Sequence, residues 1–431
     1  MKPRTNRRDF LGHAGVVGAG AWAAGNGVAC RGRSANDRLD IGVIGVEGRG
    51  AVNLDCVAGE NIVALCDVNE TNLSKAAEKF PRAYTYHDFR KMLEWDRIDA
   101  VVVTTPDHTH AAATAMALRL GKHVYCEKPL THSVHEARVI AGLASRPRVA
   151  TQMGTQVHRN YRRAVELIRS GAIGPVREVH AWTDRPIWTI PKGRLKYSAP
   201  APDHLDWDLW LGPTPERPYQ TGYQPFGWRS WWDFGTGALG DAACHILDPV
   251  FWALELGLPA AVAAEGPPVD PEVCPKGLIV RYEFPARGAL PPVKLTWYEG
   301  GRLPSSAMTG GQALPDNGLL FLGEKCKLMV KHLSGDHWLI TEGGVEAFPV
   351  PDGLRADSPD HHLEWIRACK TGGPTSSHFG QAAVLTEAIL LGNVAYRAGQ
   401  KLEWDAPNMR ASNCPEADRY IRREYRKGWT L

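Results

Sequence analysis

Between residues 39 and 129, short apolar runs alternate with amphipathic segments. Four runs are rich in β-branched residues and are typical of buried strands. They cover residues 39–46 (LDIGVIGV), 61–68 (NIVALCDV), 98–106 (IDAVVVTTP) and 122–129 (KHVYCEKP). Helix-like stretches such as NLSKAAEKF and HAAATAMALRLG separate the runs. This alternation predicts βαβ units and therefore an α/β fold with a doubly wound parallel sheet of the Rossmann type.

Later apolar runs show the two-residue alternation that is typical of strands with one covered face. The clearest are GLIVRYEFP, PVKLTWYEG and GLLFLGEKCKLMVKH. A chain of 431 residues is longer than one hydrophobic core usually serves. We therefore expect a second domain that contains these strands.

Composition excludes some classes of function. With 44% hydrophobic residues, 23% charged residues and a net charge of +3, the chain is typical of an ordinary globular protein. The basic cluster RREYRK near the C-terminus has helical spacing and contains a glutamate, as a solvated helix face does. We expect no nucleic-acid partner.

The N-terminus has the features of a targeting signal. The stretch NRRDFLG (residues 6–12) precedes a run of small residues that is too short and too glycine-rich for a transmembrane helix. It resembles a twin-arginine export signal. We expect export to the periplasm or another extracytoplasmic space, processing near residue 30, and no membrane span. Two alternatives are a disordered basic tail and a lipid anchor at Cys30, which Gly27 disfavours because leucine is usual at that position.

The turn after the first strand, GVEGRG, is a candidate phosphate-binding loop. Gly45 and Gly50 fit the dinucleotide fingerprint G-x-G-x-x-G, and Gly48 adds flexibility. Glu47 replaces the second fingerprint glycine, and its charge is unfavourable near a pyrophosphate unless it points outward or pairs with Arg49. The alternative is a plain βα loop that binds nothing.

Asp67 strengthens the interpretation of this turn. It ends the second strand, 22 residues after Gly45. An acidic residue at this place accepts hydrogen bonds from the adenosine ribose hydroxyls and repels a 2′-phosphate. The sequence therefore favours NAD over NADP as the cofactor.

Two further loops should face the cofactor, because ligands of such sheets bind at the carboxyl ends of the strands. These loops are TTPDHTH (104–110) and CEKPL (126–130). A lysine there can polarise a hydroxyl or carbonyl group during hydride transfer. No carboxylate or cysteine completes a ligand set with the two histidines of the first loop, so we expect no metal. The cofactor-site candidates from these loops are Thr105, Pro106, His110, Glu127 and Lys128.

Taken together and in this order, GVEGRG with Asp67, TTPDHTH and CEKPL resemble the Gfo/Idh/MocA oxidoreductases. The resemblance continues through TQMGTQVHRNYRRAVELIRSGAIGPVREV and WWDFGTGALGDAACHILDPVFW to the C-terminus. It implies an N-terminal Rossmann domain and a C-terminal α/β domain with a large open, mostly antiparallel sheet. We expect the signal and linker over residues 1–35, the NAD-binding domain over 36–150, and the substrate and oligomerisation domain over 151–431.

The family resemblance also implies the catalytic residues. Asp241 and His245 lie four residues apart in a segment with helical periodicity, and therefore on one helix face. The corresponding pair in the family faces the nicotinamide beside the lysine that matches Lys128. His245 would take the hydroxyl proton, Asp241 would orient the substrate or the imidazole, and Lys128 would polarise the oxygen. The alternative is a purely structural pair.

Seven of the fifteen tryptophans lie between residues 182 and 232, in segments rich in glycine and proline. Irregular loops on a rigid sheet commonly form binding sites, and indole rings stack on sugar surfaces. Arg185, Tyr223 and Trp228 are the candidate substrate residues. The alternative is that these aromatic residues only pack the loops and a subunit interface.

The sequence therefore predicts an exported, NAD-dependent oxidoreductase that acts on a sugar, cyclitol or glycoside by hydride transfer at a ring hydroxyl. Two alternatives stay open: a redox-neutral NAD-dependent glycosidase that works through a keto-sugar, and a catalytically inactive NAD-binding sensor. We expect a homo-oligomer, a dimer or tetramer, formed by face-to-face packing of the open sheet.

Overall fold

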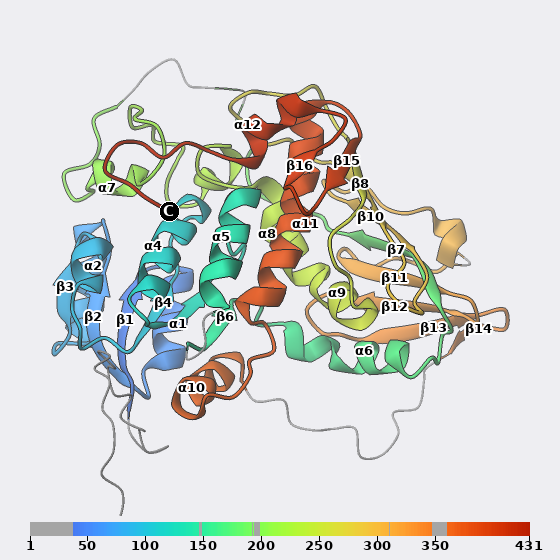
Figure 1. Cartoon of the computed structure of the whole chain (residues 1–431), viewed down its shortest axis with the longest axis horizontal. Coiled ribbons are helices and arrows are strands. Elements are labelled where there is room, and N and C mark those ends of the chain that lie inside the picture. Colours follow the sequence, from blue (N-terminus) through green and yellow to red (C-terminus); the bar gives the residue numbers. More distant parts are fainter. Residues whose placement is uncertain (1–37, 146–148, 192, 194–198, 310, 347–359) are drawn as a thin grey trace, which may run out of the picture.

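The computed structural model describes residues 38–145, 149–191, 193, 199–309, 311–346 and 360–431. Two α/β units lie side by side, with the N-terminal unit at the left of Figure 1 and a large sheet at the right. The expected export signal, with its arginine pair and Cys30, lies outside the described residues. Among the described helices, none has the length and apolarity needed to cross a membrane.

The N-terminal unit is built on a parallel six-stranded sheet with the order β3-β2-β1-β4-β5-β6. This is the order of a doubly wound dinucleotide-binding sheet and confirms the predicted fold class. The short strands β3 and β6, of three residues each, have no counterpart among the predicted runs. The elements are β1 Asp40–Ile44, α1 Arg49–Val57, β2 Asn61–Cys66, α2 Glu70–Lys79, β3 Tyr84–Tyr86, α3 Phe89–Leu93, β4 Ala100–Val103, α4 Asp107–Arg119, β5 His123–Cys126, α5 Val134–Ala144 and β6 Thr151–Met153.

Helices on both faces explain why these strands are apolar without alternation. Every residue of β1 and of β4 is buried. Helix α4 packs on this sheet and on α5 through alanines that are 4% exposed or less, such as Ala111, Ala113 and Ala115. The strand order reverses between β1 and β4, which leaves a crevice at their carboxyl ends.

The C-terminal unit contains a ten-stranded sheet with the order β14-β13-β12-β11-β7-β10-β9-β8-β15-β16. Its pairs are antiparallel except for β7 with β10, which confirms the expected mostly antiparallel sheet. The elements are α6 Arg162–Arg169, β7 Val176–Trp182, α7 Trp207–Leu211, α8 Gly237–Ile246, α9 Asp248–Leu254, β8 Ala261–Glu265, β9 Ile279–Phe284, β10 Val293–Tyr298, β11 Gly318–Gly323, β12 Lys327–Lys331, β13 His337–Thr341, β14 Gly344–Glu346, α10 His361–Thr371, α11 Phe379–Ala398, β15 Leu402–Asp405, β16 Arg410–Ala411 and α12 Asp418–Ile421.

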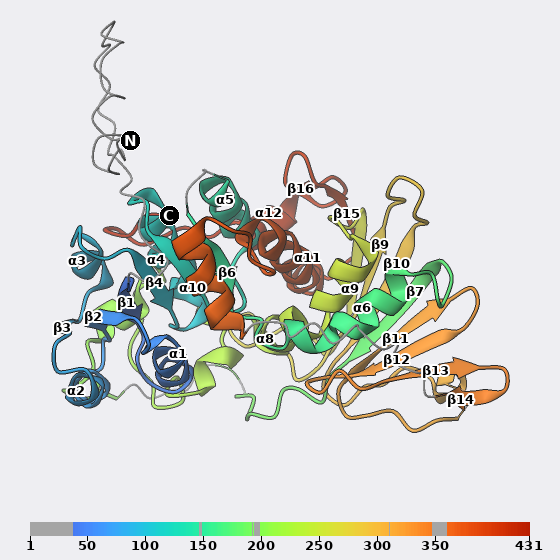
Figure 2. The ribbon, with the colours of Figure 1, turned by 90° about the horizontal axis from the view of Figure 1, so that it is seen from below.

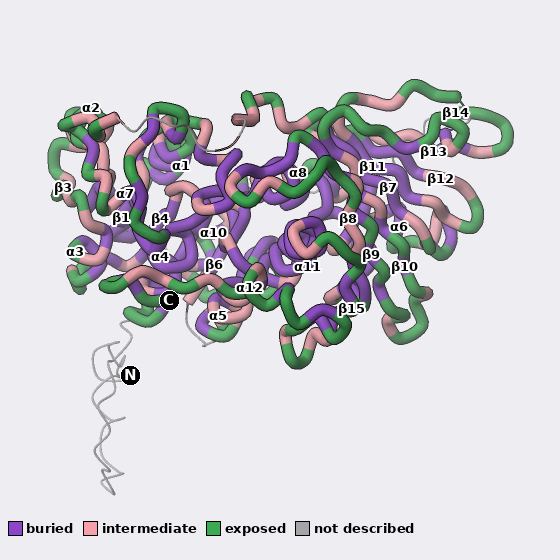
Figure 3. The backbone as a smooth tube through the Cα atoms, turned by 90° about the horizontal axis from the view of Figure 1, so that it is seen from above, coloured by how far each residue is buried: buried purple, intermediate pink, exposed green. Residues whose placement is uncertain are grey.

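Helix α11 joins the two units. It packs against α5 of the N-terminal unit and against α8 and β8 of the C-terminal unit. Fifteen of its twenty residues are buried, and its path runs through the purple centre of Figure 3. Helices α8 and α5 therefore pack on the same buried helix, one from each unit.

Helix α10 returns from the C-terminal half to the N-terminal unit. It packs against α1; Figure 1 shows it below the parallel sheet, and Figure 2, seen from below, shows it beside β6. Its Trp365 is fully buried with Val43 and Tyr125 in the core of the parallel sheet. The Rossmann unit therefore includes residues far beyond the expected boundary at residue 150.

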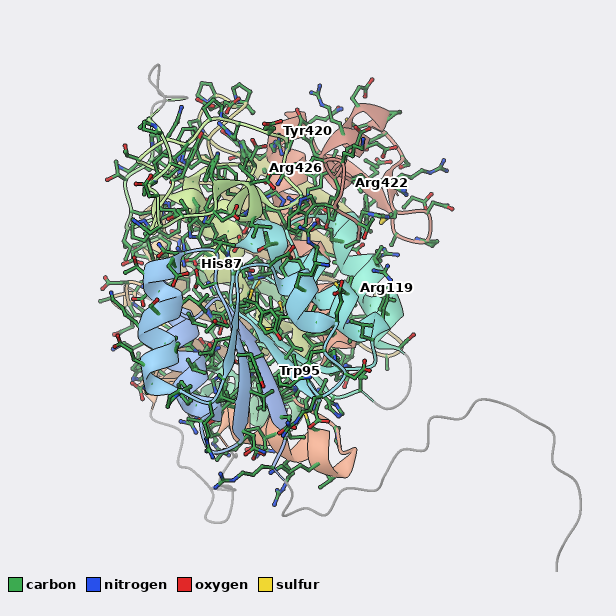
Figure 4. The ribbon with its side chains drawn as sticks, turned by 90° about the vertical axis from the view of Figure 1, so that its left-hand side faces the viewer. His87, Trp95, Arg119, Tyr420, Arg422 and Arg426 are labelled. Atoms are coloured by element: carbon green, nitrogen blue, oxygen red, sulfur yellow. The ribbon has the colours of Figure 1, made fainter. Side chains whose placement is uncertain are left out.

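The last residues of the chain also cross the N-terminal unit. Arg119 at the end of α4 donates to the carbonyl of Leu431 at 2.7 Å, and Arg90 donates to the carbonyl of Gly428 at 3.1 Å. Figure 4 views this side and shows Arg422 and Arg426 of the C-terminal segment above Arg119. Helix α10 and the last residues of the chain thus both contact the cofactor domain.

Candidate active site

The turn after β1 passes close to the end of β4, and two glycines make this approach sterically feasible. A Cβ at Gly45 would lie 2.4 Å from the carbonyl oxygen of Thr104, and a Cβ at Gly50 would lie 2.1 Å from the carbonyl oxygen of Gly45. Both distances are far below van der Waals contact, so only glycine fits. Gly48 has a φ of 60° and open space around it, while Glu47 and Arg49 beside it are exposed.

Asp67 closes β2 beside this turn. Its carboxylate accepts hydrogen bonds from the N–H groups of Val46 at 3.0 Å and Asn69 at 2.9 Å. Burial raises the pKa of Asp67, the two backbone donors lower it, and the nearby charge of Glu47 adds to the rise. The carboxylate is therefore fixed at the place where the sequence predicts the adenosine ribose contact.

These features fit a dinucleotide. Helix α1 has no side-chain cap at its N-terminus, although the N–H of Gly50 donates to the carbonyl of Glu47 at 2.9 Å. The N-terminus of a helix favours the negative charge of a pyrophosphate. The two sterically required glycines lie directly before it, and Asp67 lies at the end of the neighbouring strand. The residues that would hold NAD therefore lie together at the carboxyl ends of β1 and β2, next to the crevice between β1 and β4, and only Glu47 departs from the fingerprint.

Glu127 supports the cofactor loop from below. Its buried carboxylate accepts from Arg49 Nε at 3.1 Å, from Asn53 Nδ2 at 2.9 Å and from Gln156 Nε2 at 2.6 Å. Burial opposes its ionisation, but Arg49 and Asn53 outweigh this and lower the pKa of Glu127. A Cβ at residue 154 would lie 2.7 Å from this carboxylate, so Gly154 makes room for it. Glu127 therefore positions Arg49 and helix α1.

His110 connects the two predicted cofactor loops. Its Nδ1 lies 2.7 Å from the carbonyl of Pro129, and its Nε2 lies 2.8 Å from the carbonyl of Thr105. Both nitrogens therefore donate, which requires the imidazolium form. Burial opposes this charge, but Cys126, Asp107 and the Pro129 carbonyl raise the pKa of His110 to about 10. Within the described residues, no three His, Cys, Asp or Glu side chains converge as metal ligands.

Lys128 and Asp241 form the contact between the two units at the carboxyl end of β5. Lys128 Nζ donates to Asp241 Oδ1 and to the Asp241 carbonyl, both at 2.7 Å. Both side chains are 15% exposed. The lysine of CEKPL thus meets helix α8 of the second unit, which brings two of the three predicted catalytic residues together.

Two arginines complete the surroundings of Asp241. Arg229 Nε lies 3.5 Å from Oδ1, and Arg185 Nη1 lies 3.8 Å from Oδ2. Burial opposes ionisation of Asp241, but Lys128 and Arg229 outweigh it and hold the pKa of this carboxyl well below its usual range. Asp241 is therefore an anion at any physiological pH.

His245 lies one helical turn after Asp241 on α8. Burial lowers the pKa of His245 well below its usual value, and the charge of Lys128 lowers it further. Its Nδ1 has no hydrogen-bond partner among the described residues. Its ring centre lies 6.3 Å from that of His332, whose pKa burial lowers to about 4. Two neutral imidazoles therefore lie beside the Lys128–Asp241 pair.

The predicted aromatic residues have two different positions. Tyr223 is fully buried and packs with Trp207, Trp210 and Phe234 in a core beneath the loops. The structure therefore corrects its expected role, because a fully buried ring offers no face to a ligand. Trp228 is 8% exposed, and the Arg229 guanidinium lies 4.2 Å from its ring centre.

Arg49 is a cofactor-site candidate from the sequence, but Arg229, His332 and the other two partners of Glu127, Asn53 and Gln156, are not marked by it. Arg229 comes from the short helix Gly227–Ser230, and His332 comes from the connection between β12 and β13. Tyr161 hydrogen-bonds His332 Nδ1 and stacks on its ring. No local spacing marks these residues, because tertiary packing brings them to α8.

Two family models match the chain. The N-terminal model, described as an oxidoreductase family with an NAD-binding Rossmann fold, matches residues 39–155. The model of the same family's C-terminal α/β domain matches residues 172–285. Together the matches span more than half of the chain. The first model agrees with the fit of the crevice to NAD.

Individual relatives match a smaller part. An inositol 2-dehydrogenase of Rubrobacter xylanophilus is 30% identical over 157 residues, which are 35% of this chain and 45% of the relative. A glycosyl hydrolase family 109 protein of Solibacter usitatus is 35% identical over 152 residues, which are 31% of this chain and 35% of the relative. The chain thus spans less than half the length of these relatives.

A solved structure shares the fold over nearly its whole length. The aldose-aldose oxidoreductase of Caulobacter crescentus aligns with a TM-score of 0.57 at 18% identity, over 85% of this chain and 100% of that one. At this identity the likeness concerns the fold alone. With both domain models matched and the glycine turn in place, the chain belongs to the Gfo/Idh/MocA family of oxidoreductases.

Proposed function

We propose that this protein oxidises a ring hydroxyl of a sugar, cyclitol or glycoside with NAD as the hydride acceptor. The observation that carries the proposal is the contact of Lys128 with Asp241, with His245 one turn later on α8. These groups lie at the same edge of the parallel sheet as the cofactor turn. The printed activity of the Rubrobacter relative supports a cyclitol or sugar substrate.

The residues divide the work by their charge. NAD, when bound, accepts the hydride from the substrate carbon. Lys128 is fixed by Asp241 and can donate to the hydroxyl oxygen, which favours the developing carbonyl. His245 is neutral and only partly buried, so its ring can take the hydroxyl proton. Asp241 stays ionised and holds the lysine in place.

A panel assay tests this activity. Purified protein with NAD is offered sugars, cyclitols and glycosides, and NADH formation is followed by absorbance. We expect reduction with at least one class of polyol and loss of reduction in His245→Ala. Bound NAD with no turnover on any member, and with none of the glycoside chemistry described next, would favour the inactive sensor.

A second candidate is a redox-neutral glycosidase. The Solibacter relative, which carries a glycosidase name, favours it, as does His332 as a second neutral base. The ring hydroxyl is oxidised to a ketone, the acidified neighbouring C–H is deprotonated, and the glycosidic bond eliminates. Water then adds to the alkene, and the hydride returns to the ketone, so the net reaction is hydrolysis. Aryl glycosides incubated without added NAD test this candidate by release of the aryl alcohol.

The expected compartment suggests how NAD is used. A twin-arginine signal would carry the protein folded, and the space outside the membrane supplies no reliable NAD. We infer that NAD stays bound and is restored on the enzyme in each cycle, either by reduction of a second sugar or by the redox-neutral route. Mass analysis of the purified mature protein should find bound nucleotide. An empty protein that works only with stoichiometric external NAD would contradict this inference.

The expected oligomer would use the sheet face that lies away from α8 and α11. Trp182, Leu320, Met329 and Ile340 form a separate apolar cluster there. These four side chains are already at most 7% exposed within one chain, so a second copy would pack on the outer surface of this layer, and a two-fold arrangement would pair like with like. Light scattering of the purified protein tests for a dimer or tetramer.

A further inference from the structure

The arginines at Asp241 have more hydrogen-bond donors than the protein uses. A guanidinium carries five N–H donors. Among the described residues, Arg229 makes two hydrogen bonds, both at 3.5 Å: Nε with Asp241 Oδ1 and Nη1 with the carbonyl of Phe226. These distances are at the outer limit of a hydrogen bond. Among the described residues, Asp241 is the only carboxylate that Arg229 or Arg185 contacts.

Arg229 is held ready for a planar ligand. Its guanidinium lies 4.0 Å from the ring centre of Phe226 and 4.2 Å from that of Trp228. Aromatic rings on its faces fix its plane and leave the N–H edge free. Its side chain is only 20% exposed, so water meets a small part of this edge.

Arg185 approaches the same carboxylate from another loop. Its carbonyl accepts from the N–H of Gly300 at 2.6 Å, which anchors the main chain next to β10. Its guanidinium has no closer partner among the described residues than Asp241 Oδ2 at 3.8 Å. The main chain of Arg185 is thus held by a hydrogen bond, while its guanidinium can donate hydrogen bonds to a ligand.

Arg217 is an arginine of the same region whose guanidinium is paired with carboxylates of the protein itself. It belongs to the same aromatic loops, and its guanidinium also lies near three rings. In contrast to Arg229, it pairs with two carboxylates, Asp233 and Glu272, the latter at 2.9 Å. Arg217 thus has two carboxylates as partners of its own. Arg229 and Arg185, in contrast, share the single carboxylate of Asp241, which also binds Lys128.

We propose that the substrate carries a carboxylate, as a uronic acid or its glycoside does, and that Arg229 and Arg185 bind it beside Lys128 and His245. The inference rests on the proposed function of the same site. A planar carboxylate matches the guanidinium edge with two parallel hydrogen bonds. The ring hydroxyl of the same sugar then lies within the group formed by Lys128 and His245.

Matched ligand pairs test the proposal on NAD-saturated protein by calorimetry. The pairs are the methyl glycosides of glucuronate, galacturonate and mannuronate, each with its neutral parent glycoside. We expect at least one acid to bind about 10- to 100-fold more tightly than its parent. No preference for the acid in any pair overturns the proposal. Preference for a sugar 6-sulfate over every uronate overturns the carboxylate assignment.

Variants separate the arginines from the rest of the site. Arg229→Gln should remove most of the preference for the acid, and Arg229→Lys should restore part of it, because lysine keeps the charge but lacks the fork. Arg281→Gln, at an exposed pair with Glu265, is the matched control and should leave binding unchanged. Equal weakening of acid and parent in Arg229→Gln overturns the assignment.

The proposed activity and the carboxylate site would be contradicted by different results. Tight binding of an acid without NADH formation or glycoside cleavage contradicts the proposed activity and leaves the carboxylate site in place. Turnover of neutral sugars with no preference for acids supports the activity and contradicts the carboxylate site.

Discussion

Individual side chains at the site owe their charge states to their neighbours. Asp241 is kept ionised by Lys128 and two arginines, while burial and the same lysine keep His245 neutral. An anion (Asp241) and a neutral base (His245) therefore lie one helical turn apart on α8, and a cation (Lys128) contacts the first of them. Proton transfer from a hydroxyl needs this division, because a protonated imidazole could not act as the base.

Loss of Lys128 or of His245 should lower turnover and leave cofactor binding unchanged. We expect Lys128→Ala and His245→Ala each to lower kcat by about 10²- to 10⁴-fold, with a double variant far from additive. NAD affinity, measured by calorimetry, should be unchanged. Lys401→Ala, at an exposed pair with Glu283, provides the control. A near-normal rate in His245→Ala would remove this residue from the mechanism.

The fixed carboxylate of Asp67 should set the choice of nucleotide. NAD should bind more tightly than NADP, and Asp67→Ala should narrow the difference because it removes the charge that repels a 2′-phosphate. Glu47→Gly should keep or improve NAD binding, since Glu47 is exposed and glycine restores the fingerprint. Calorimetry with both nucleotides measures these effects. Tighter NADP binding by the unchanged chain would contradict this account.

At the scale of elements, buried polar links hold the loops of the cofactor crevice. His110 on α4 joins the carbonyls of Thr105 and Pro129, and Glu127 joins β5 to helix α1. Helix α10 adds a third link, because His362 Nε2 lies 3.0 Å from Asn53 Oδ1. Each loop that should contact NAD is thus fixed by a side chain behind it.

Because of the His110 hydrogen bonds, the free energy of unfolding should depend on pH in the alkaline range. Its pKa in the folded protein is raised to about 10, above the usual value near 6.5. Its contribution is therefore complete below the unfolded pKa and is lost as pH rises toward about 10. Thermal unfolding over this range should show a decline that His110→Gln reduces. An identical pH profile in His110→Gln would show that the ring is not charged.

Trp365 should stabilise the parallel sheet although it belongs to the C-terminal half. Trp365→Ala should lower the free energy of unfolding by about 3 to 5 kcal/mol, as expected for removal of a fully buried large ring. Leu363→Ala on the same helix is the control: Leu363 is 56% exposed, and its loss should cost about 0.5 kcal/mol or less. Urea unfolding measures both. Equal costs would mean that α10 packs elsewhere in solution.

At the scale of the whole molecule, some parts of the site follow from local sequence patterns, and others depend on tertiary packing. Gly45, Asp67, Lys128 and the Asp241–His245 spacing lie in strands and helices whose periodicity is visible, so the sequence predicts the fold class and the central site. Arg229 could not be predicted, because its place beside Asp241 depends on how an irregular loop folds. The prediction for Tyr223 differs from its buried position because a ring in such a loop can equally turn inward.

The return of α10 has a consequence for the order of synthesis. The core around Val43 and Tyr125 closes only when Trp365 is present, and Trp365 leaves the ribosome after most of the chain. The first domain therefore cannot finish folding while it is the only part made, although all its strands are available early. The core of this domain is therefore completed only late in synthesis, once Trp365 has been added. A chain that must be loaded with cofactor before crossing a membrane would need an export route that waits for folding.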